Sequence, residues 1–524
     1  MSSNDHTQPR FHRGVTFFLA LLLSMSVCIL GAGTSLQGAL VFDHPAATAR
    51  EHFERTIAYE QAVANEPEWL RRPLLLFLGR VRPALPEAID VYEEVVELQV
   101  RALRGETTAV ASDKEEHAPD SPAQDGAPAD AKPKPTSVFG CTPTVVEPEP
   151  KDTRAELCEL LARRAILQGE AGRFDDLLLS IARIEGLGER ELARTIRAAY
   201  SPPDARVTPT ALAIDMSLLQ PGWARDRFEL RCAERSGDTE RVTVLTEAAN
   251  AREDALRRSG RTVAWALLTA IALGLGALLV WLLRDRPALP CSTASIPPEW
   301  NFEDGLAVLL RALALGAIGY LGVRIASQGF AEDWLFVGTW LATPLPLLYL
   351  YHKGLIAPRA LSRVRVLGID AFPGGVGRWA LVVFGLFTAD QLGQSLILEL
   401  CGHIGLGQPW VESAQELLLR ISPLAFAATC AVAVLWSPFV DELARRGLLF
   451  LTLRARMPLM SAALWSSALV AAFQNLSLPA FLMTIWSGFL CALAFERTKS
   501  ILPAVIAQTL GYAGFLGAFA AFYR

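Results

Sequence analysis

Two acids and two arginines directly follow a long apolar run. The run covers residues 421–440, and Asp441, Glu442, Arg445 and Arg446 come after it. Because side chains four residues apart share one face of a helix, Asp441 should face Arg445. Glu442 should face Arg446 for the same reason. Paired charges at a membrane surface can simply neutralise each other, whereas a buried carboxylate can serve as a general base. The sequence leaves both interpretations open.

The composition indicates a membrane protein. Of the 524 residues, 52% are hydrophobic. Runs of about 20 apolar residues, enough to cross a bilayer core, recur along the chain. The net charge is −5, and we expect membrane lipid rather than nucleic acid as a partner. The eight cysteines include no Cys-x-x-Cys pair, so the chain has no zinc-knuckle or thioredoxin-type motif.

The first hydrophobic segment follows a basic start. Residues 1–14 are polar and include Arg10 and Arg13, and residues 15–41 are mostly apolar. A basic flank before an apolar core is typical of a signal peptide or a signal anchor. The length of the segment favours an uncleaved anchor with a cytoplasmic N-terminus, and cleavage near Ala32 stays open.

A large polar region, residues 42–260, should be helical in two segments, 42–104 and 153–260. In the first segment, apolar residues recur at three- and four-residue steps, as on one helix face. They are Ile89, Tyr92, Val96, Val100 and Leu103. In the second segment, two apolar runs flank Gly169-x-x-Gly172, which predicts a helical hairpin.

An Ala/Pro-rich stretch, residues 105–152, separates these two segments. Its composition cannot bury a core, so it predicts a disordered linker. Cys141 lies in the linker, and Cys158 and Cys232 lie in the second segment. One disulfide could form among the three, and its pairing stays open.

The rest of the chain, residues 263–524, contains a series of expected membrane spans. They are 263–283, 305–325, 333–352, 378–400, 419–440, 460–476, 479–495 and 501–522. With the anchor, the total is about nine spans. Basic residues follow every second span, whereas the intervening loops are acidic. By the positive-inside rule, Asp441 and Glu442 then lie at the cytoplasmic side and residues 42–260 lie outside the cytoplasm.

The expected fold is therefore an all-α, polytopic membrane helix bundle. An extracytoplasmic helical domain is inserted after its first span. We expect the protein in a cytoplasmic membrane, the inner membrane of a bacterium.

Two further stretches extend the pattern that begins at Asp441. Residues 466–474 read Ser-Ser-Ala-Leu-Val-Ala-Ala-Phe-Gln, and residues 497–512 run from Arg-Thr-Lys-Ser through Gln508 to Tyr512. Over residues 420–524 the chain resembles the CPBP family (CAAX protease and bacteriocin-processing, or Abi), which consists of intramembrane endopeptidases. The family motifs are Glu-Glu-x-x-x-Arg, Phe-x-x-x-His and His-x-x-x-Asn.

The resemblance assigns each motif position to a residue of this chain. In the order of the motifs, these residues are Asp441, Glu442, Arg446, Val470, Gln474, Gln508 and Tyr512. In the family, the first acid and a His activate water for attack on a peptide bond, and the other His and the Asn hold the developing oxyanion. The resemblance therefore implies catalytic roles for Asp441, Glu442, Arg446, Gln474, Gln508 and Tyr512 in cleaving membrane-associated peptides.

The chain departs from the motifs at the groups that carry the chemistry. Asp441 has one methylene fewer than Glu, which withdraws its carboxylate by about 1.5 Å. A misplacement of about 1 Å can cost about a hundredfold in rate. Gln474 and Gln508 keep a hydrogen-bond donor but can neither shuttle a proton nor bind a metal as His does. His403 is the last histidine of the chain, and we expect no metal and no cofactor at the site.

A second polar cluster lies inside the span 378–400. Asp390 and Gln394 share one helix face there, which should turn towards the bundle interior. They could line a substrate cavity or an ion path, or they could form hydrogen bonds between helices. Arg311 could pair with Asp390.

Three functions follow as alternatives. The first is a diverged CPBP-like endopeptidase that cleaves membrane-embedded peptides. The second is a catalytically silent relative, a pseudoprotease that binds a membrane peptide and recruits a protein partner through residues 42–260. The third is a transporter or channel that uses Asp390 and Arg311.

Overall fold

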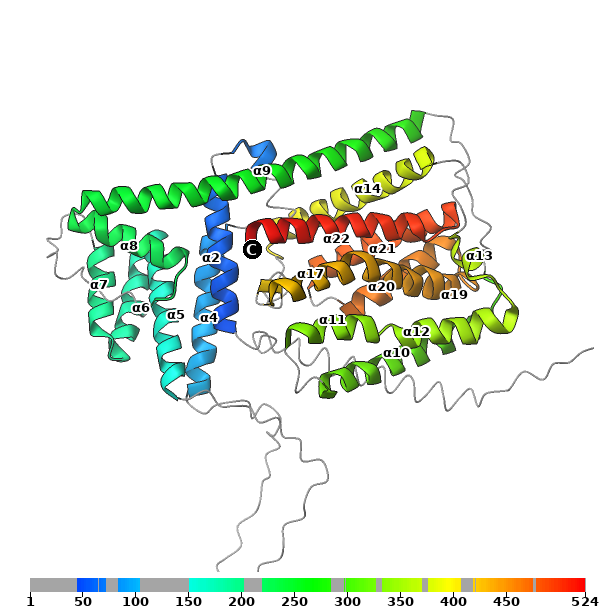
Figure 1. The fold of residues 1–524 in the computed structure, drawn as a ribbon, viewed down its shortest axis with the longest axis horizontal. Helices are drawn as coiled ribbons and strands as arrows, with labels where there is room; N and C mark the ends of the chain where they lie inside the picture. Colours follow the sequence, from blue (N-terminus) through cyan, green and yellow to red (C-terminus); the bar gives the residue numbers. More distant parts are fainter. Residues whose placement is uncertain are drawn as a thin grey trace, which may run out of the picture. The chain divides into compact units, whose positions relative to one another are not determined.

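The structure is a computed structural model. It describes residues 45–64, 66–71, 83–103, 150–201, 219–283, 296, 298–326, 332–369, 376–406, 418–419, 421–474 and 477–523. Every regular element in these residues is a helix, as Figure 1 shows. The predicted all-α fold is thereby confirmed. The first hydrophobic segment, 15–41, and nearly all of the linker, 105–152, lie outside the described residues.

The chain divides into two compact units. We call Ile89–Thr239 the helical unit, and Met1–Ala88 together with Glu240–Arg524 the membrane unit. The helical unit holds most of α4 (Ala84–Leu103) and the helices α5 (Pro150–Glu170), α6 (Phe174–Gly186), α7 (Arg190–Tyr200) and α8 (Trp223–Ser236).

The predicted helical hairpin forms between α5 and α6. Gly172 lies between them with a φ of 71°, a left-handed value that favours glycine. Gly169 allows a close helix contact, because a Cβ at this position would lie 2.5 Å from the ring of Tyr200 on α7. The Gly-x-x-Gly signal therefore marks both a turn and a contact between helices.

Ion pairs of α5 hold the helical unit together. Arg163 is buried, pairs with Glu159 at 2.8 Å and donates to the carbonyl of Gln220 at 2.6 Å. Glu170, at the end of the same helix, pairs with Arg231 of α8 at 2.8 Å. Since these bonds reach segments far along the chain, α5 is the central helix of the unit.

The two described cysteines of the helical unit form no disulfide within the described residues. Cys158 and Cys232 are both buried, and Cys141 lies outside the described residues. Burial raises the pKa of the Cys158 thiol to about 11, and the nearby Glu189 carboxylate acts in the same direction. Cys158 is therefore a packed, unreactive thiol.

The membrane unit contains the remaining helices. They are α2 (Pro45–Val63), α9 (Thr239–Leu283), α10 (Phe302–Ala326), α11 (Glu332–Ala342), α12 (Leu345–Leu350), α13 (Arg363–Leu367), α14 (Val376–His403), α17 (Pro423–Ala431), α18 (Ser437–Glu442), α19 (Leu451–Arg454), α20 (Leu459–Gln474), α21 (Leu478–Thr498) and α22 (Leu502–Tyr523). Three π-helical segments, η5 (Tyr351–Ile356), η7 (Val432–Trp436) and η8 (Leu443–Phe450), and one 3-10 turn, η6 (Ala357–Arg359), join them.

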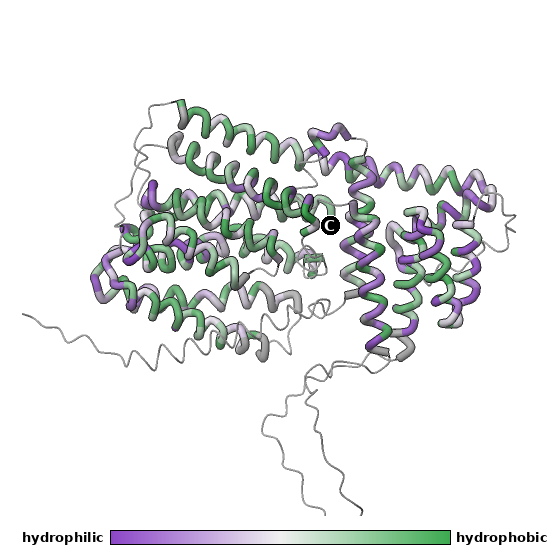
Figure 2. Tube along the Cα trace, turned by 180° about the vertical axis from the view of Figure 1, so that it is seen from behind, coloured by the Kyte–Doolittle hydropathy of each residue, from purple (hydrophilic) through white to green (hydrophobic). Residues whose placement is uncertain are grey.

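Five helices of the described residues are long and apolar enough to cross a membrane. They cover Thr239–Val280, Trp379–His403, Pro423–Arg454, Leu478–Thr498 and Leu502–Phe522. This confirms an integral membrane helix bundle, whereas the count of about nine spans stays a prediction. Figure 2 shows how α9 changes from hydrophilic to hydrophobic along its length.

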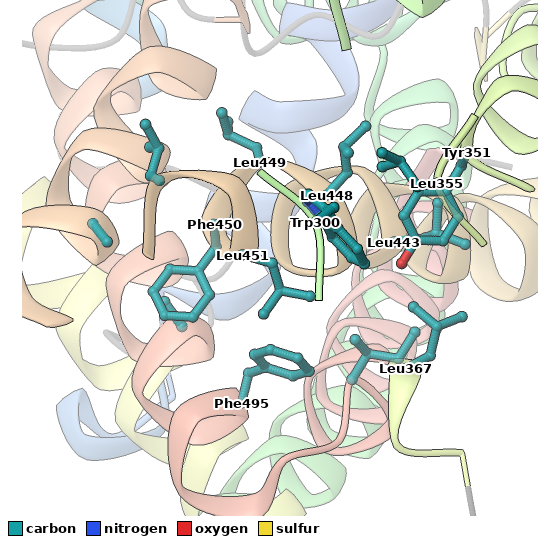
Figure 3. Packing of buried hydrophobic residues seen from close by; sticks show 14 of the residues in the cluster. Trp300, Tyr351, Leu355, Leu367, Leu443, Leu448, Leu449, Phe450, Leu451 and Phe495 are labelled. Carbon is teal, nitrogen blue, oxygen red and sulfur yellow. The ribbon is translucent and has the colours of Figure 1, made fainter. Parts of the chain in front are cut away.

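A hydrophobic core surrounds the π-helical segment η8 (Figure 3). Leu448 and Phe450 are fully buried there, and the ring of Phe450 meets that of Phe495 edge to face at 6.0 Å. The Tyr351 hydroxyl donates to the carbonyl of Gly447 at 3.0 Å. A π-helical turn leaves the usual i→i+4 bonding pattern, so this outside donor helps to satisfy a buried carbonyl. The core thus fixes the segment that carries Arg445 and Arg446.

Candidate functional site

The four charged residues of the first motif lie at the junction of two helix types. Asp441 and Glu442 end α18, and Arg445 and Arg446 lie in η8, which begins at the next residue. Both expected pairs form: Arg446 Nη1 lies 2.8 Å from Glu442 Oε1, and Arg445 Nη2 lies 3.7 Å from Asp441 Oδ2. The helix-spacing prediction is therefore confirmed for both pairs.

Glu442 is the centre of a buried network. Its side chain is 0% exposed, and that of Arg446 is 3% exposed. Besides the Arg446 contact, Glu442 Oε1 accepts a hydrogen bond from Gln508 Nε2 of α22 at 2.6 Å. Arg446 Nη2 donates to the carbonyl of Gly488 in α21 at 2.9 Å. A buried ion pair is tolerated only with such additional hydrogen bonds, and here these bonds join three parts of the bundle.

The two acids have different surroundings. The Asp441 side chain is 27% exposed. Its Oδ2 accepts a hydrogen bond from Ser437 Oγ at 3.4 Å, at the long end of the range. The Glu442 carboxylate is therefore shielded from solvent, whereas the Asp441 carboxylate is partly accessible to it.

Tyr512 lies one helical turn after Gln508 on α22. It is close enough to Asp441 and Arg445 for their charges to act on its phenol. α22 therefore brings two of the motif positions to the acids.

The second polar cluster borders the same network. Asp390 Oδ2 accepts a hydrogen bond from Gln394 Nε2 at 2.9 Å, which confirms that these side chains share a face of α14. Ser487 of α21 also hydrogen-bonds to Asp390, and the charge of Arg446 reaches it. The interpretation of Asp390 as a residue that hydrogen-bonds between helices is supported by the Ser487 bond.

Three acceptor oxygens at this site have no donor within the described residues. They are Asp390 Oδ1, Glu442 Oε2 and Gln508 Oε1. Arg446 donates Nη1 to Glu442 Oε1 and Nη2 to the carbonyl of Gly488. The interior of the site therefore holds three buried acceptor oxygens that these bonds do not satisfy.

A small cavity of about 10 Å³ lies beside Arg446, roughly the space of one water molecule. Its lining consists of Arg445, Arg446, Ser466, Ser467, Val470, Thr484 and Gly488. Glu442 and Asp441 do not line it. The space beside the motif is thus bordered by guanidinium groups and by hydroxyls, two of which donate to the carbonyl of Ala463, and not by the acids.

The structure brings most of the motif residues together. Glu442, Arg446 and Gln508 are directly bonded, and Asp441 and Tyr512 adjoin them. The side chain of Gln474, the last residue of α20, lies outside the described residues. Among the described residues, no three His, Cys, Asp or Glu side chains gather in a way that could hold a metal ion.

Comparison with known families agrees with this geometry. Residues 423–511 match a family described as type II CAAX prenyl endopeptidase Rce1-like. This match supports membership of the region in the CAAX protease (CPBP) family. The matched residues begin with α17 and include Asp441, Glu442 and Gln508, and Tyr512 follows one residue beyond them. No curated protein and no solved structure matches the chain.

The sequence did not predict two contacts of this CAAX protease-like site. The first is the Gly488 carbonyl, which holds Arg446. A Cβ at Gly488 would lie 2.5 Å from Ser467 Oγ, so glycine lets α20 and α21 approach closely. The second is the proximity of Asp390, which no motif marks. Its position within an apolar span was the one available signal.

Proposed function

We propose that this chain is a non-hydrolytic CAAX protease-like membrane protein, which binds a membrane-anchored peptide without cleaving it. One observation carries the proposal: Glu442 is fully buried and bonded to Arg446 and Gln508. The residue in the position of a motif His thus serves as a hydrogen-bond donor to the second acid.

Peptide hydrolysis needs a base within hydrogen-bond reach of water, and a partner that can exchange a proton. Gln508 offers an amide, which donates but does not titrate. Glu442 Oε1 already accepts bonds from Arg446 and Gln508, and the small cavity does not reach its carboxylate. Glu442 is therefore suited to hold the bundle together and poorly suited to activate water.

Peptide binding is supported by the guanidinium donors beside the small cavity. The Ser466 and Ser467 hydroxyls at its border donate to the Ala463 carbonyl, so the main donors there are the guanidinium groups of Arg445 and Arg446. Such donors suit the carbonyl oxygens of a peptide, which are acceptors. A bound segment would then lie against α20 and α21.

A specific observation also favours the endopeptidase alternative. Asp441 is partly exposed, and its ion pair with Arg445 spans 3.7 Å. Its carboxylate is therefore held more weakly than that of Glu442 and is more accessible to water. Asp441 is the residue at which weak hydrolysis would originate.

The helical unit fits the scaffold part of this proposal. We propose that it recruits a protein partner and that it lies outside the cytoplasm, with the N-terminus of the chain inside, as the distribution of basic loops indicates.

Photo-crosslinking can test the binding. A photoreactive amino acid replaces Val470, which borders the small cavity, in the full chain in nanodiscs. The same replacement at Leu464, an exposed position of the same helix, is the matched control. Membrane-anchored peptides are added, and the adducts are weighed by mass spectrometry.

We expect adducts of the intact peptide at position 470 and none at position 464. Equal labelling at both positions, or none at 470, would remove the peptide-binding proposal. Adducts of peptide fragments would support the endopeptidase instead.

A further inference from the structure

A cavity of about 530 Å³ lies between α9, α14 and α22 of the membrane unit. Its walls are almost entirely apolar, with Ala270 on α9, Phe387 on α14 and Gly517 on α22 among them. Polar side chains are confined to one end, where Ser259 and Thr262 of α9 contribute hydroxyls. α9 lies outside residues 423–511, so an element beyond the family match forms one wall.

The cavity exists because α9 approaches α14 closely and stays apart from α22. A Cβ at Gly274 of α9 would clash with Thr388 and with the backbone of Phe384 on α14. In contrast, a Cβ at Gly517 of α22 would meet nothing within 4 Å. Small residues on α22 thus leave a space that the neighbouring helix does not fill.

The depth of the cavity equals about one leaflet of a membrane. Its lining on α9 runs from Ser259 to Ala270. At 1.5 Å per helical residue this is about 16 Å, and the hydrocarbon core of a bilayer is about 30 Å thick. A single acyl chain of a phospholipid has this reach.

The polar end of the cavity lies where α9 meets the membrane surface. The charged residues of α9 end at Arg261, and the apolar sequence begins directly afterwards. The ring of Trp265 lies 5.8 Å from that of Trp69, and both side chains are 56% exposed. Exposed tryptophans gather at the level of lipid headgroups, so the opening at Ser259 and Thr262 lies at this level.

The charges at this end favour an anionic headgroup. Arg257 and Arg261 share the carboxylate of Glu66, at 3.8 and 2.8 Å, and Arg257 also contacts Asp254. Arg258 is exposed and makes no ion pair within the described residues; its Nε donates to a carbonyl of its own helix. This end therefore carries three guanidinium groups and two carboxylates. The excess positive charge can attract a phosphate.

We propose that this cavity binds one anionic phospholipid. One acyl chain lies between α9 and α22, and the phosphate lies at Arg258. The lipid fills the space between α9 and α22, the last helix of the bundle, and so stabilises the packing of these two helices. The proposal rests on the fold alone and holds whether or not the bundle cleaves peptides.

Native mass spectrometry of the full chain, purified in mild detergent with phosphatidylglycerol or phosphatidylcholine, tests this proposal. Gly517→Leu places a side chain in the cavity at a position where the added Cβ meets nothing within 4 Å. Gly276→Leu is the matched control, because this glycine of α9 is also exposed, meets nothing within 4 Å and does not line the cavity. Arg258→Gln removes the unpaired guanidinium.

The wild type should carry one phospholipid and should prefer phosphatidylglycerol. Gly517→Leu should lose the lipid, Gly276→Leu should keep it, and Arg258→Gln should keep it without the preference. Retention of the lipid by Gly517→Leu would overturn the proposal. An unchanged preference in Arg258→Gln would also overturn it, as would a wild type that carries no lipid.

Discussion

Gln508 donates its side-chain amide to Glu442 across 2.6 Å. The residue in a motif-His position is thus bonded to the second acid of the first motif. A His in this position could exchange protons with its surroundings, whereas the amide of Gln508 cannot. The bond links α22 to α18 and gives the residue at this motif position a structural role.

Removal of this amide should destabilise the bundle. Gln508→Ala leaves the buried Glu442 carboxylate with one donor fewer, at a cost of about 1–3 kcal/mol. Gln391→Ala is the matched control, a partly buried glutamine on α14 for which no hydrogen bond is described. Thermal unfolding in detergent measures both. A Gln508→Ala midpoint equal to that of the control would contradict the structural role of the amide.

Arg446 should be the most sensitive residue of the site. Arg446→Met leaves Glu442 charged and buried without its ion-pair partner, which costs about 3–5 kcal/mol. Arg456→Met removes an arginine whose side chain is 63% exposed and whose ion pair spans 3.7 Å, so its cost should stay within about 1 kcal/mol. The folded yield after detergent extraction and the unfolding midpoint separate the two variants. Equal losses of stability would show that the buried Arg446–Glu442 pair contributes no more than an exposed ion pair.

The family residues and the helices could be predicted from sequence because both depend on local patterns. The i,i+4 pairs of Asp441 and Glu442 follow from helix spacing, and apolar runs of span length locate the helices. The bond between Gln508 and Glu442 joins residues 66 positions apart. The family motifs place both residues in one site, but helix spacing does not encode the bond between them. The π-helical segment η8 was also missed, because its residues read as ordinary helix formers.

Because several buried acceptor oxygens of the site have no donor within the described residues, we expect that the negative charge of Asp390 is not needed for stability. Asp390→Asn replaces the carboxylate by an amide of the same shape. The Oδ1 atom of Asp390 accepts no hydrogen bond from these residues, so the substitution removes a buried charge without breaking a bond to that atom. Stability should stay the same or rise, because within the described part of the chain Arg446 is bonded to Glu442 and no guanidinium is bonded to Asp390. The unfolding midpoint of the purified variant checks this. A loss of more than about 1 kcal/mol would mean that Asp390 has a cationic partner worth as much as a salt bridge.

The thiol of Cys158 should be protected in the folded helical unit. Its pKa is raised from 9.0 to about 11. Because only the thiolate reacts, alkylation at pH 8 should be about a hundredfold slower than in the unfolded chain. Iodoacetamide labelling with peptide mapping, with and without denaturant, measures the ratio. Rapid labelling of the folded protein would contradict burial of this thiol.

The most direct test of the central claim is a cleavage measurement on the purified full chain in nanodiscs. A library of membrane-anchored peptides is incubated with the wild type and with Asp441→Asn, with and without a chelator, and the products are identified by mass spectrometry. If the Gln508 amide, which bonds to Glu442, cannot exchange a proton as a motif His would, the wild type forms no more product than Asp441→Asn. Product that the wild type forms and Asp441→Asn does not would contradict the account and establish an endopeptidase that works through Asp441.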